Sequence, residues 1–187
     1  MSSAATLSRP SALQAARRLD LNKNIGTELR GVELLSLSDE GVAEVKQLLA
    51  ERGVLVFRDQ PMTLQQQIEL GRRFGKLHVH PAFADKAHPE ALRIHADADS
   101  SYAAGEAWHT DVSCDLEPPG ISMLRIEVVP SAGGDTAFAS MYKAWDDLSK
   151  PLQEMLLGLE AVHAGDLPYR GTYKSTSKKE YPINVHP

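Results

Sequence analysis

The sequence has 187 residues, 42% of them hydrophobic, which is enough for the packed core of one domain. Its net charge of -5 comes from interspersed acidic and basic residues, which argues against a nucleic-acid surface and favours a small-molecule partner. A single cysteine, Cys114, excludes an internal disulfide framework and is typical of a reducing compartment, so we expect a cytoplasmic protein. No apolar run approaches the length of a membrane span, so we expect no membrane partner.

The first 18 residues differ in composition from the rest of the chain. They are rich in Ala, Ser and Arg, and no acidic residue precedes Asp20. This composition overlaps with that of an organellar transit peptide. Pro10 interrupts any long amphipathic helix, however, and favours a plain extension. The sequence therefore predicts a flexible tail at residues 1–18 and one folded region at residues 19–187.

The folded region opens with short strands at residues 19–37, around Gly26 and Gly31, with Ile25, Leu29 and Val32 as candidates to point inward. Ser38 then predicts the N-cap of a helix, whose apolar positions recur at helical spacing until Gly53. The continuous apolar run at residues 54–57 is typical of a strand that is buried on both faces.

A second helix is predicted from a capping box between Thr63 and Gln66, and it should end at Gly75. His78 and His80 follow on one face of an extended segment. They are candidate metal ligands in a cupin-like arrangement. A structural alternative is that His80 only caps a strand against Pro81.

The middle of the chain predicts more strands. Residues 92–95 indicate one strand, and residues 96–107 form a loop rich in Asp, Ser, Ala and Gly that could act as a lid. Residues 121–129 are the longest strand-like run, residues 130–135 form a turn, and residues 136–139 return as a strand.

Two more helices are predicted at residues 141–148 and 151–163, with His163 at the end of the second. The second helix carries an apolar stripe that we expect to belong to the core, consisting of Leu152, Met155, Leu156 and Leu159. Residues 165–187 are polar and irregular, and they indicate a mobile loop.

The segment Trp108-His109-Thr110-Asp111 is the strongest indication of chemistry. In an extended segment, residues two apart point to the same side, so His109 and Asp111 can offer an imidazole and a carboxylate to one metal ion. With a later His they would make the 2-His-1-carboxylate triad of Fe(II) oxygenases. A lone His-x-Asp is weak evidence, because the chain holds a second copy at His95 and Asp97.

The surroundings of the pair carry more information than the pair itself. Six segments stand in a characteristic order: Phe57-Arg58-Asp59-Gln60, Arg73-Phe74-Gly75, Leu77-His78-Val79-His80-Pro81, Trp108-His109-Thr110-Asp111-Val112, Pro118-Pro119 and Gly133-Gly134-Asp135-Thr136. In this order and spacing the chain resembles the taurine dioxygenase (TauD/TfdA) family of Fe(II)/2-oxoglutarate-dependent oxygenases. The resemblance favours His109 and Asp111 over the second copy. In the family, the His-x-Asp pair follows a Trp and precedes the Pro-Pro and Gly-Gly-Asp-Thr segments.

The resemblance implies an α+β chain, mostly β with flanking helices, built on a double-stranded β-helix (jelly roll) that is incomplete here. It implies that Fe(II) is held by His109, Asp111 and a downstream His, and that 2-oxoglutarate and O2 are co-substrates. Thr136 would bind the distal carboxylate of 2-oxoglutarate, although an ordinary β-forming role for Thr136 stays open. Cys114 lies next to the pair but is expected to be a small buried hydrophobe.

For the substrate, the resemblance implies a small anion whose head binds His80. Where the taurine enzyme uses an Asn and a Tyr, this chain has Gly105 and Phe83. The loss of two hydrogen-bonding groups argues against taurine itself and leaves another sulfonate, a sulfate ester or an aryloxyalkanoate, hydroxylated next to a heteroatom. A role in sulfur metabolism follows from the first two.

The chain also departs from the family pattern. In the family, the distal His ligand and the Arg that binds 2-oxoglutarate lie beyond the length of this chain. His186 resembles a His-Pro that lies between the halves of the family fold, and the spacing of Arg125 does not match that Arg. A catalytically inert truncated fragment is therefore the alternative function, and a homo-oligomer stays open.

Overall fold

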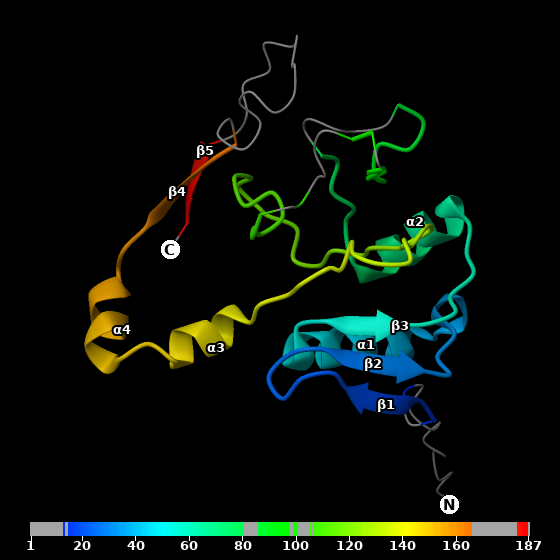
Figure 1. Ribbon diagram of the computed structural model, residues 1–187, viewed down its shortest axis with the longest axis horizontal. Coiled ribbons are helices and arrows are strands. Elements are labelled where there is room, and N and C mark those ends of the chain that lie inside the picture. Colours follow the sequence, from blue (N-terminus) through cyan, green and yellow to red (C-terminus); the bar gives the residue numbers. More distant parts are fainter. Residues whose placement is uncertain are drawn as a thin grey trace, which may run out of the picture. The chain divides into compact units, whose positions relative to one another are not determined.

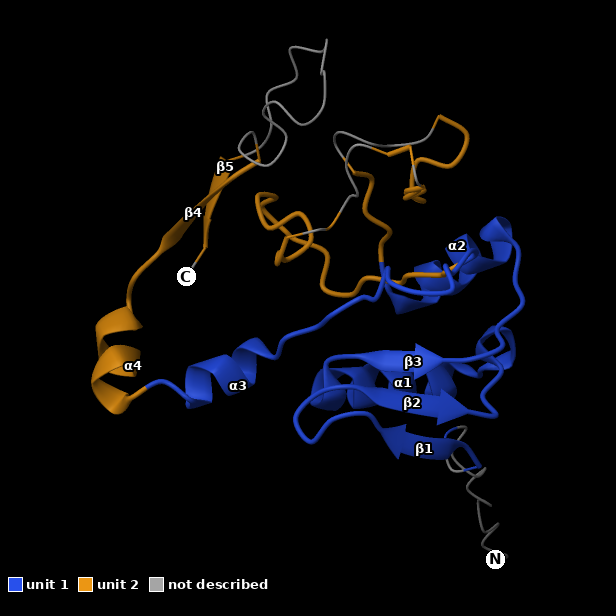
Figure 2. Ribbon diagram, in the orientation of Figure 1, with its two compact units in different colours: residues 1–75, 127–148 blue, residues 76–126, 149–187 orange. Residues whose placement is uncertain are grey.

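The computed structural model describes residues 13, 15–80, 86–97, 99–100, 105, 107–165 and 183–186. The chain divides into two compact units (Figure 2). Unit 1 comprises residues 1–75 and 127–148, and unit 2 comprises residues 76–126 and 149–187. Among the described residues, no helix is long and apolar enough to cross a membrane.

Unit 1 is built on a three-stranded sheet, in the order β1 (Arg17–Asp20), β2 (Thr27–Arg30), β3 (Leu55–Phe57) (Figure 1). β1 pairs antiparallel with β2, and β2 pairs parallel with β3. The strands predicted at residues 19–37 and 54–57 are thus confirmed, but β1 already begins at Arg17, inside the segment that was expected to be a flexible tail. β3 is only half-buried, however, and not buried on both faces as expected, because it lies at the edge of this sheet.

The two helices of the N-terminal half begin and end where the sequence predicts. α1 (Asp39–Arg52) starts at Ser38, whose hydroxyl accepts a hydrogen bond from the Gly41 N–H, and ends at Gly53 with φ of 67°. α2 (Leu64–Phe74) starts with the full capping box of Thr63 and Gln66. The core of unit 1 lies between these helices, β2 and the 3-10 helix η1 (Leu34–Ser36), and it contains Leu29, Val32, Leu34, Leu37, Val42, Val45, Leu48 and Leu70.

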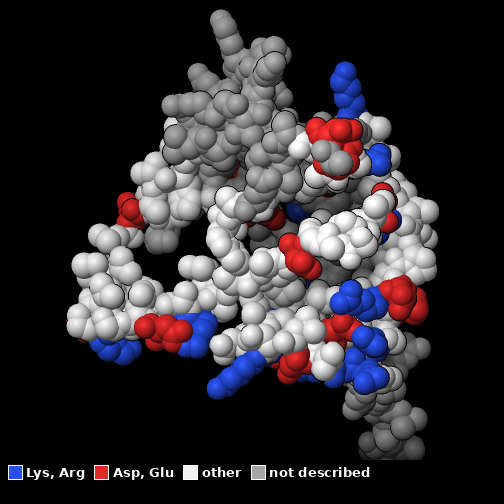
Figure 3. All heavy atoms as spheres, viewed as in Figure 1, with Lys and Arg blue, Asp and Glu red and all other residues white. Residues whose placement is uncertain are grey.

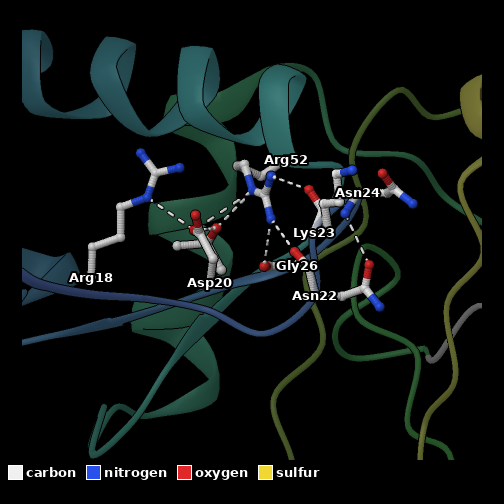
Figure 4. Close-up of polar contacts among 8 residues, drawn as sticks. Arg18, Asp20, Asn22, Lys23, Asn24, Gly26 and Arg52 are labelled. Carbon is white, nitrogen blue, oxygen red and sulfur yellow. Dashed lines mark hydrogen bonds and ion pairs between the residues drawn. The ribbon is translucent and has the colours of Figure 1, made fainter.

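Two polar side chains fix the loops of unit 1. The Gln60 amide donates to the Val32 carbonyl at 2.7 Å and accepts from the Leu34 N–H at 3.0 Å, so it holds the start of η1. The Arg52 guanidinium, at the end of α1, donates to three carbonyls of the loop between β1 and β2, those of Asn22, Lys23 and Gly26 (Figure 4). It also donates to the Thr27 hydroxyl at 2.9 Å.

We expect Arg52→Met to destabilise the chain by about 2–3 kcal/mol, because several loop carbonyls lose a charged donor in a largely buried position. The measurement is the free energy of unfolding from urea denaturation. Lys23→Met is the matched control, because only the backbone carbonyl of Lys23 is used by Arg52, and it should change stability by less than about 0.5 kcal/mol. Equal effects of the two substitutions would contradict this role of Arg52.

The C-terminal helices are shorter than expected. α3 (Met141–Asp146) confirms the first prediction, and α4 (Lys150–Leu156) replaces the predicted helix at residues 151–163. The chain leaves the helix at Leu157, whose ψ of 128° is extended, and Gly158, with φ of 84°, completes the turn before β4 (Ala161–Ala164). His163 therefore lies on a strand, which corrects its expected place at a helix end.

β4 pairs antiparallel with β5 (Ile183–His186) to form a second, two-stranded sheet in unit 2. β5 corrects the prediction of a loop over residues 165–187, most of which lie outside the described residues. The expected core stripe on the last helix is also wrong here, because its four side chains are exposed: Leu152, Met155, Leu156 and Leu159.

Three predicted strands do not form. Residues 92–95, 121–129 and 136–139 pair with no strand in the described part of the chain, and apolar side chains such as Val128 are exposed. A strand-like sequence forms a ladder only where a backbone partner lies beside it, so its β-propensity depends on context. The described strands thus form two separate small sheets and no jelly roll. On the face shown in Figure 3, Lys and Arg lie among Asp and Glu.

Candidate metal centre

His109 and Asp111 lie in unit 2, where Asp111 begins a turn that continues through residues 112–115. The pair was expected on an extended strand, but no strand forms here, because the chain bends immediately after Asp111. The two side chains nevertheless meet. His109 Nε2 lies 3.2 Å from Asp111 Oδ1, and His109 Nδ1 lies 2.8 Å from the Ala107 carbonyl oxygen.

These distances suit a metal ion. A carbonyl oxygen can only accept, so Nδ1 of His109 must donate its proton to Ala107. The other ring nitrogen, Nε2, faces the Asp111 carboxylate. Two ligands about 2.1 Å from one ion, in neighbouring octahedral positions, lie about 3 Å apart. These two atoms are close enough to hold one metal ion together, and both side chains are about half exposed, which leaves room for further ligands.

Ser122 bonds the second carboxylate oxygen of Asp111, a contact that the sequence did not indicate. Its hydroxyl donates to Asp111 Oδ2 at 2.5 Å, while Oδ1 faces His109 Nε2. A hydrogen bond of this kind orients a ligating carboxylate. Ser122 lies eleven residues after Asp111, in a run that we expected to be an ordinary strand, and no spacing rule identifies such a hydroxyl.

The second His-x-Asp copy forms a similar contact but is used differently. His95 Nε2 lies 3.2 Å from Asp97 Oδ2. Asp97 Oδ1 accepts from the Ser100 hydroxyl and the Asp99 N–H, so the carboxylate caps its own loop. The hydrogen bond from Ser100 is the main cause that lowers the pKa of Asp97. The carboxylate of this second pair thus stabilises a local turn.

The other candidate histidines lie in the same unit. His78 Nε2 is 2.5 Å from Asp115 Oδ2, and the rings of His78 and His80 pack edge to face with their centroids 6.5 Å apart. Burial is the main cause that lowers the pKa of His80, so its ring is neutral near pH 7 and can donate one N–H. Nowhere in the described parts of the chain do three His, Cys, Asp or Glu side chains gather to hold a metal ion, so the cupin-like cluster does not form there.

The remaining predicted residues are placed as follows. Gly105 lies beside the pair: a Cβ built on it would be 3.6 Å from His109 Cε1, and its φ of 92° favours glycine. Phe83 lies outside the described residues. Thr136 is an exposed residue of unit 1, outside any strand. Cys114 is buried, and burial raises the pKa of its thiol, so the prediction of a small buried hydrophobe is confirmed.

Comparison with known proteins decides the family. The sequence profile described as "Taurine catabolism dioxygenase TauD, TfdA family" matches residues 16–187. The chain belongs to the TauD/TfdA family. Within it, an alpha-ketoglutarate-dependent sulfonate dioxygenase of Saccharomyces cerevisiae is 35% identical, over 89% of this chain and 44% of the relative. A (S)-phenoxypropionate/alpha-ketoglutarate-dioxygenase of Sphingobium herbicidovorans is 34% identical, over 77% of this chain and 52% of the relative.

The TauD/TfdA assignment extends to solved structures. The crystal structure of a taurine dioxygenase from Burkholderia xenovorans superimposes with a TM-score of 0.67 at 34% identity, over 80% of this chain and 53% of that chain. The chain thus spans about half the length of the TauD/TfdA relatives that it matches. The resemblance found from six short segments of sequence is confirmed.

Proposed function

We propose that this chain provides the N-terminal part, residues 19–187, of a jelly-roll Fe(II)- and 2-oxoglutarate-dependent dioxygenase, which hydroxylates a small anionic substrate next to a heteroatom. The main support is the pairing of His109 Nε2 with Asp111 Oδ1 at 3.2 Å, with Ser122 on the other carboxylate oxygen. When bound, Fe(II) supplies the chemistry that couples decarboxylation of 2-oxoglutarate by O2 to hydroxylation of a C–H bond.

The residues of the chain then have distinct tasks. His109 and Asp111 would hold the iron, with a third ligand, a downstream His, supplied outside the described residues. Thr136 would bind the distal carboxylate of 2-oxoglutarate through its hydroxyl. His80, as a partly buried neutral imidazole, would donate its N–H to the anionic head of the substrate.

The substrate class follows from two kinds of support. The two relatives are named for a sulfonate and for a phenoxypropionate, and both are anions with a C–H bond next to a heteroatom. At the two positions where the taurine enzyme has an Asn and a Tyr, this chain has Gly105, which lies beside His109, and Phe83. Neither side chain can form a hydrogen bond with the substrate. We therefore propose a sulfonate other than taurine, a sulfate ester or an aryloxyalkanoate.

The test is production of succinate from 2-oxoglutarate by the full chain under air, with Fe(II) and each of four anions: taurine, an alkyl sulfonate, an alkyl sulfate and a phenoxyalkanoate. Succinate that depends on one of the last three, with taurine at least about tenfold poorer, supports the proposal. Binding of Fe(II) without any turnover is the result expected of an inert fragment. Equal succinate from His109→Ala would contradict the proposed metal site.

His80→Ala separates the dioxygenase from a cupin-like metal site. Because His80 is assigned to the substrate and not to the metal, Mn(II) affinity should stay within about twofold. Affinity for the accepted anion should fall at least about tenfold, because a hydrogen bond to a charged group is lost. Calorimetry on the full chain measures both, with Mn(II) and 2-oxoglutarate present in the second titration. A large loss of Mn(II) affinity would favour a cupin-like metal site with His78 and His80 as ligands.

A further inference from the structure

One face of the β4–β5 hairpin contacts the turn that follows Asp111. Three polar side chains of the hairpin each bond one of three consecutive turn residues. His163 Nδ1 lies 2.9 Å from the Ser113 hydroxyl, and Asn184 Nδ2 donates to the Cys114 carbonyl at 2.6 Å. His186 Nε2 donates to the Asp115 carbonyl at 3.0 Å. All of these residues belong to unit 2.

The strand register explains why these three side chains act together. His163 and Asn184 are directly opposite each other in the β4–β5 ladder, and residues two apart on a strand share a face. The rings of His163 and His186 also pack edge to face, 5.3 Å apart. Along β5, Asn184 and His186 are half-buried, whereas Ile183 and Val185 are exposed. The hairpin therefore has one polar face toward the turn and one apolar face away from it.

The turn itself holds a strained residue. Val112, between Asp111 and the bonded residues, has φ of 46°, a left-handed conformation that a β-branched side chain rarely adopts. Such a conformation costs of the order of 1–3 kcal/mol and persists only where surrounding contacts impose it. The Asp115 N–H donates to the Val112 carbonyl at 3.0 Å, and the Asp115 carboxylate is also bonded to His78 Nε2.

From this arrangement we infer that the hairpin face formed by His163, Asn184 and His186 is a positioning device for the metal ligand Asp111. Its hydrogen bonds keep Val112 in the left-handed conformation, and that bend sets the direction in which the Asp111 carboxylate leaves the backbone. The inference rests on the proposed function, because it takes Asp111 as a ligand. Contacts around a ligand commonly change metal affinity by about 10–100-fold.

The test compares Asn184→Leu with Val185→Thr in the full chain. Leu is similar in size to Asn but has no donor for the Cys114 carbonyl, whereas residue 185 points away from the turn. We expect Asn184→Leu to weaken Mn(II) binding about tenfold, followed by electron paramagnetic resonance, and to speed amide hydrogen exchange in residues 111–116. Val185→Thr should change neither. The melting temperature of each variant is recorded, so that general destabilisation is visible.

The two readouts separate the failure of this inference from that of the proposed function. If the wild-type chain binds Mn(II) and Asn184→Leu binds it equally well, the positioning role is overturned, whatever the exchange rates. If exchange in residues 111–116 is unchanged, the hairpin does not fix the turn, which also overturns it. If the wild-type chain binds no Mn(II) while exchange still rises, the metal site fails and the control of the turn by the hairpin stands.

Discussion

Asp111→Ala is expected to weaken Mn(II) binding at least about 100-fold, because it removes one of the two proposed metal ligands, which lie 3.2 Å apart. The remaining imidazole, His109, would then have to hold the ion alone. The measurement is the free Mn(II) signal in an electron paramagnetic resonance titration of the full chain, with Mn(II) as the redox-stable substitute for Fe(II).

Asp97→Ala is the matched control for this substitution. It removes the carboxylate of the second His-x-Asp copy, which has the same 3.2 Å contact with its histidine but caps its own loop. We expect Mn(II) affinity to stay within about twofold, since Asp97 is not assigned to the metal. An equal loss in both variants, or retained binding in Asp111→Ala, would show that the ligand is assigned wrongly.

Ser122→Ala is expected to weaken Mn(II) binding about tenfold or more while leaving both ligands in place. Without the hydroxyl, Asp111 Oδ2 loses its 2.5 Å hydrogen bond, and the carboxylate can rotate away from the direction that serves His109. The same titration measures the effect. Because Ser122 is exposed and not part of the core, the substitution should change the stability of the chain by only about 0.5 kcal/mol.

Ser122→Thr keeps a hydroxyl at this position and should retain most of the affinity. If both variants bind Mn(II) as the wild-type chain does, the Ser122 hydrogen bond has no part in ligand orientation. If both lose affinity equally, the effect comes from packing and not from the hydroxyl.

Local signals in the sequence predicted the N-terminal half well. The caps at Ser38 and Thr63 and the glycine at position 53 define α1 and α2 within a few residues, because capping depends on neighbours in sequence. The burial of Leu29 and Val32 also follows from the local pattern. These elements need no information from distant parts of the chain.

The errors arose where structure depends on distant partners or on one residue. Residues 121–129 have the composition of a strand but pair with none in the described chain. α4 ends early in a turn formed by Leu157, with an extended backbone, and Gly158, with a left-handed φ, although the apolar spacing continues to Leu159. The strand β5 depends on pairing with β4, and the polar composition of residues 165–187 does not indicate that pairing.

For the candidate site, the sequence predicted that His109 and Asp111 meet, but not the contacts around them. His109 and Asp111 are two residues apart, so their meeting is a local property. Ser122 reaches Asp111 across 11 positions, and His186 reaches Asp115 across 71. Contacts at such separations depend on the fold, and a single sequence carries no spacing rule for them. The resemblance to the TauD/TfdA family indicated the candidate site but neither Ser122 nor the β4–β5 hairpin.

The most direct test of a 2-oxoglutarate-binding iron site is an anaerobic titration of the full chain with Fe(II) and 2-oxoglutarate, followed by visible absorption. We predict the weak charge-transfer band of a chelated complex, saturating with Fe(II) and lost in His109→Ala. A band in the wild-type chain that disappears in the variant would show that this chain assembles the site. No band in the wild-type chain, or an equal band in the variant, would contradict it.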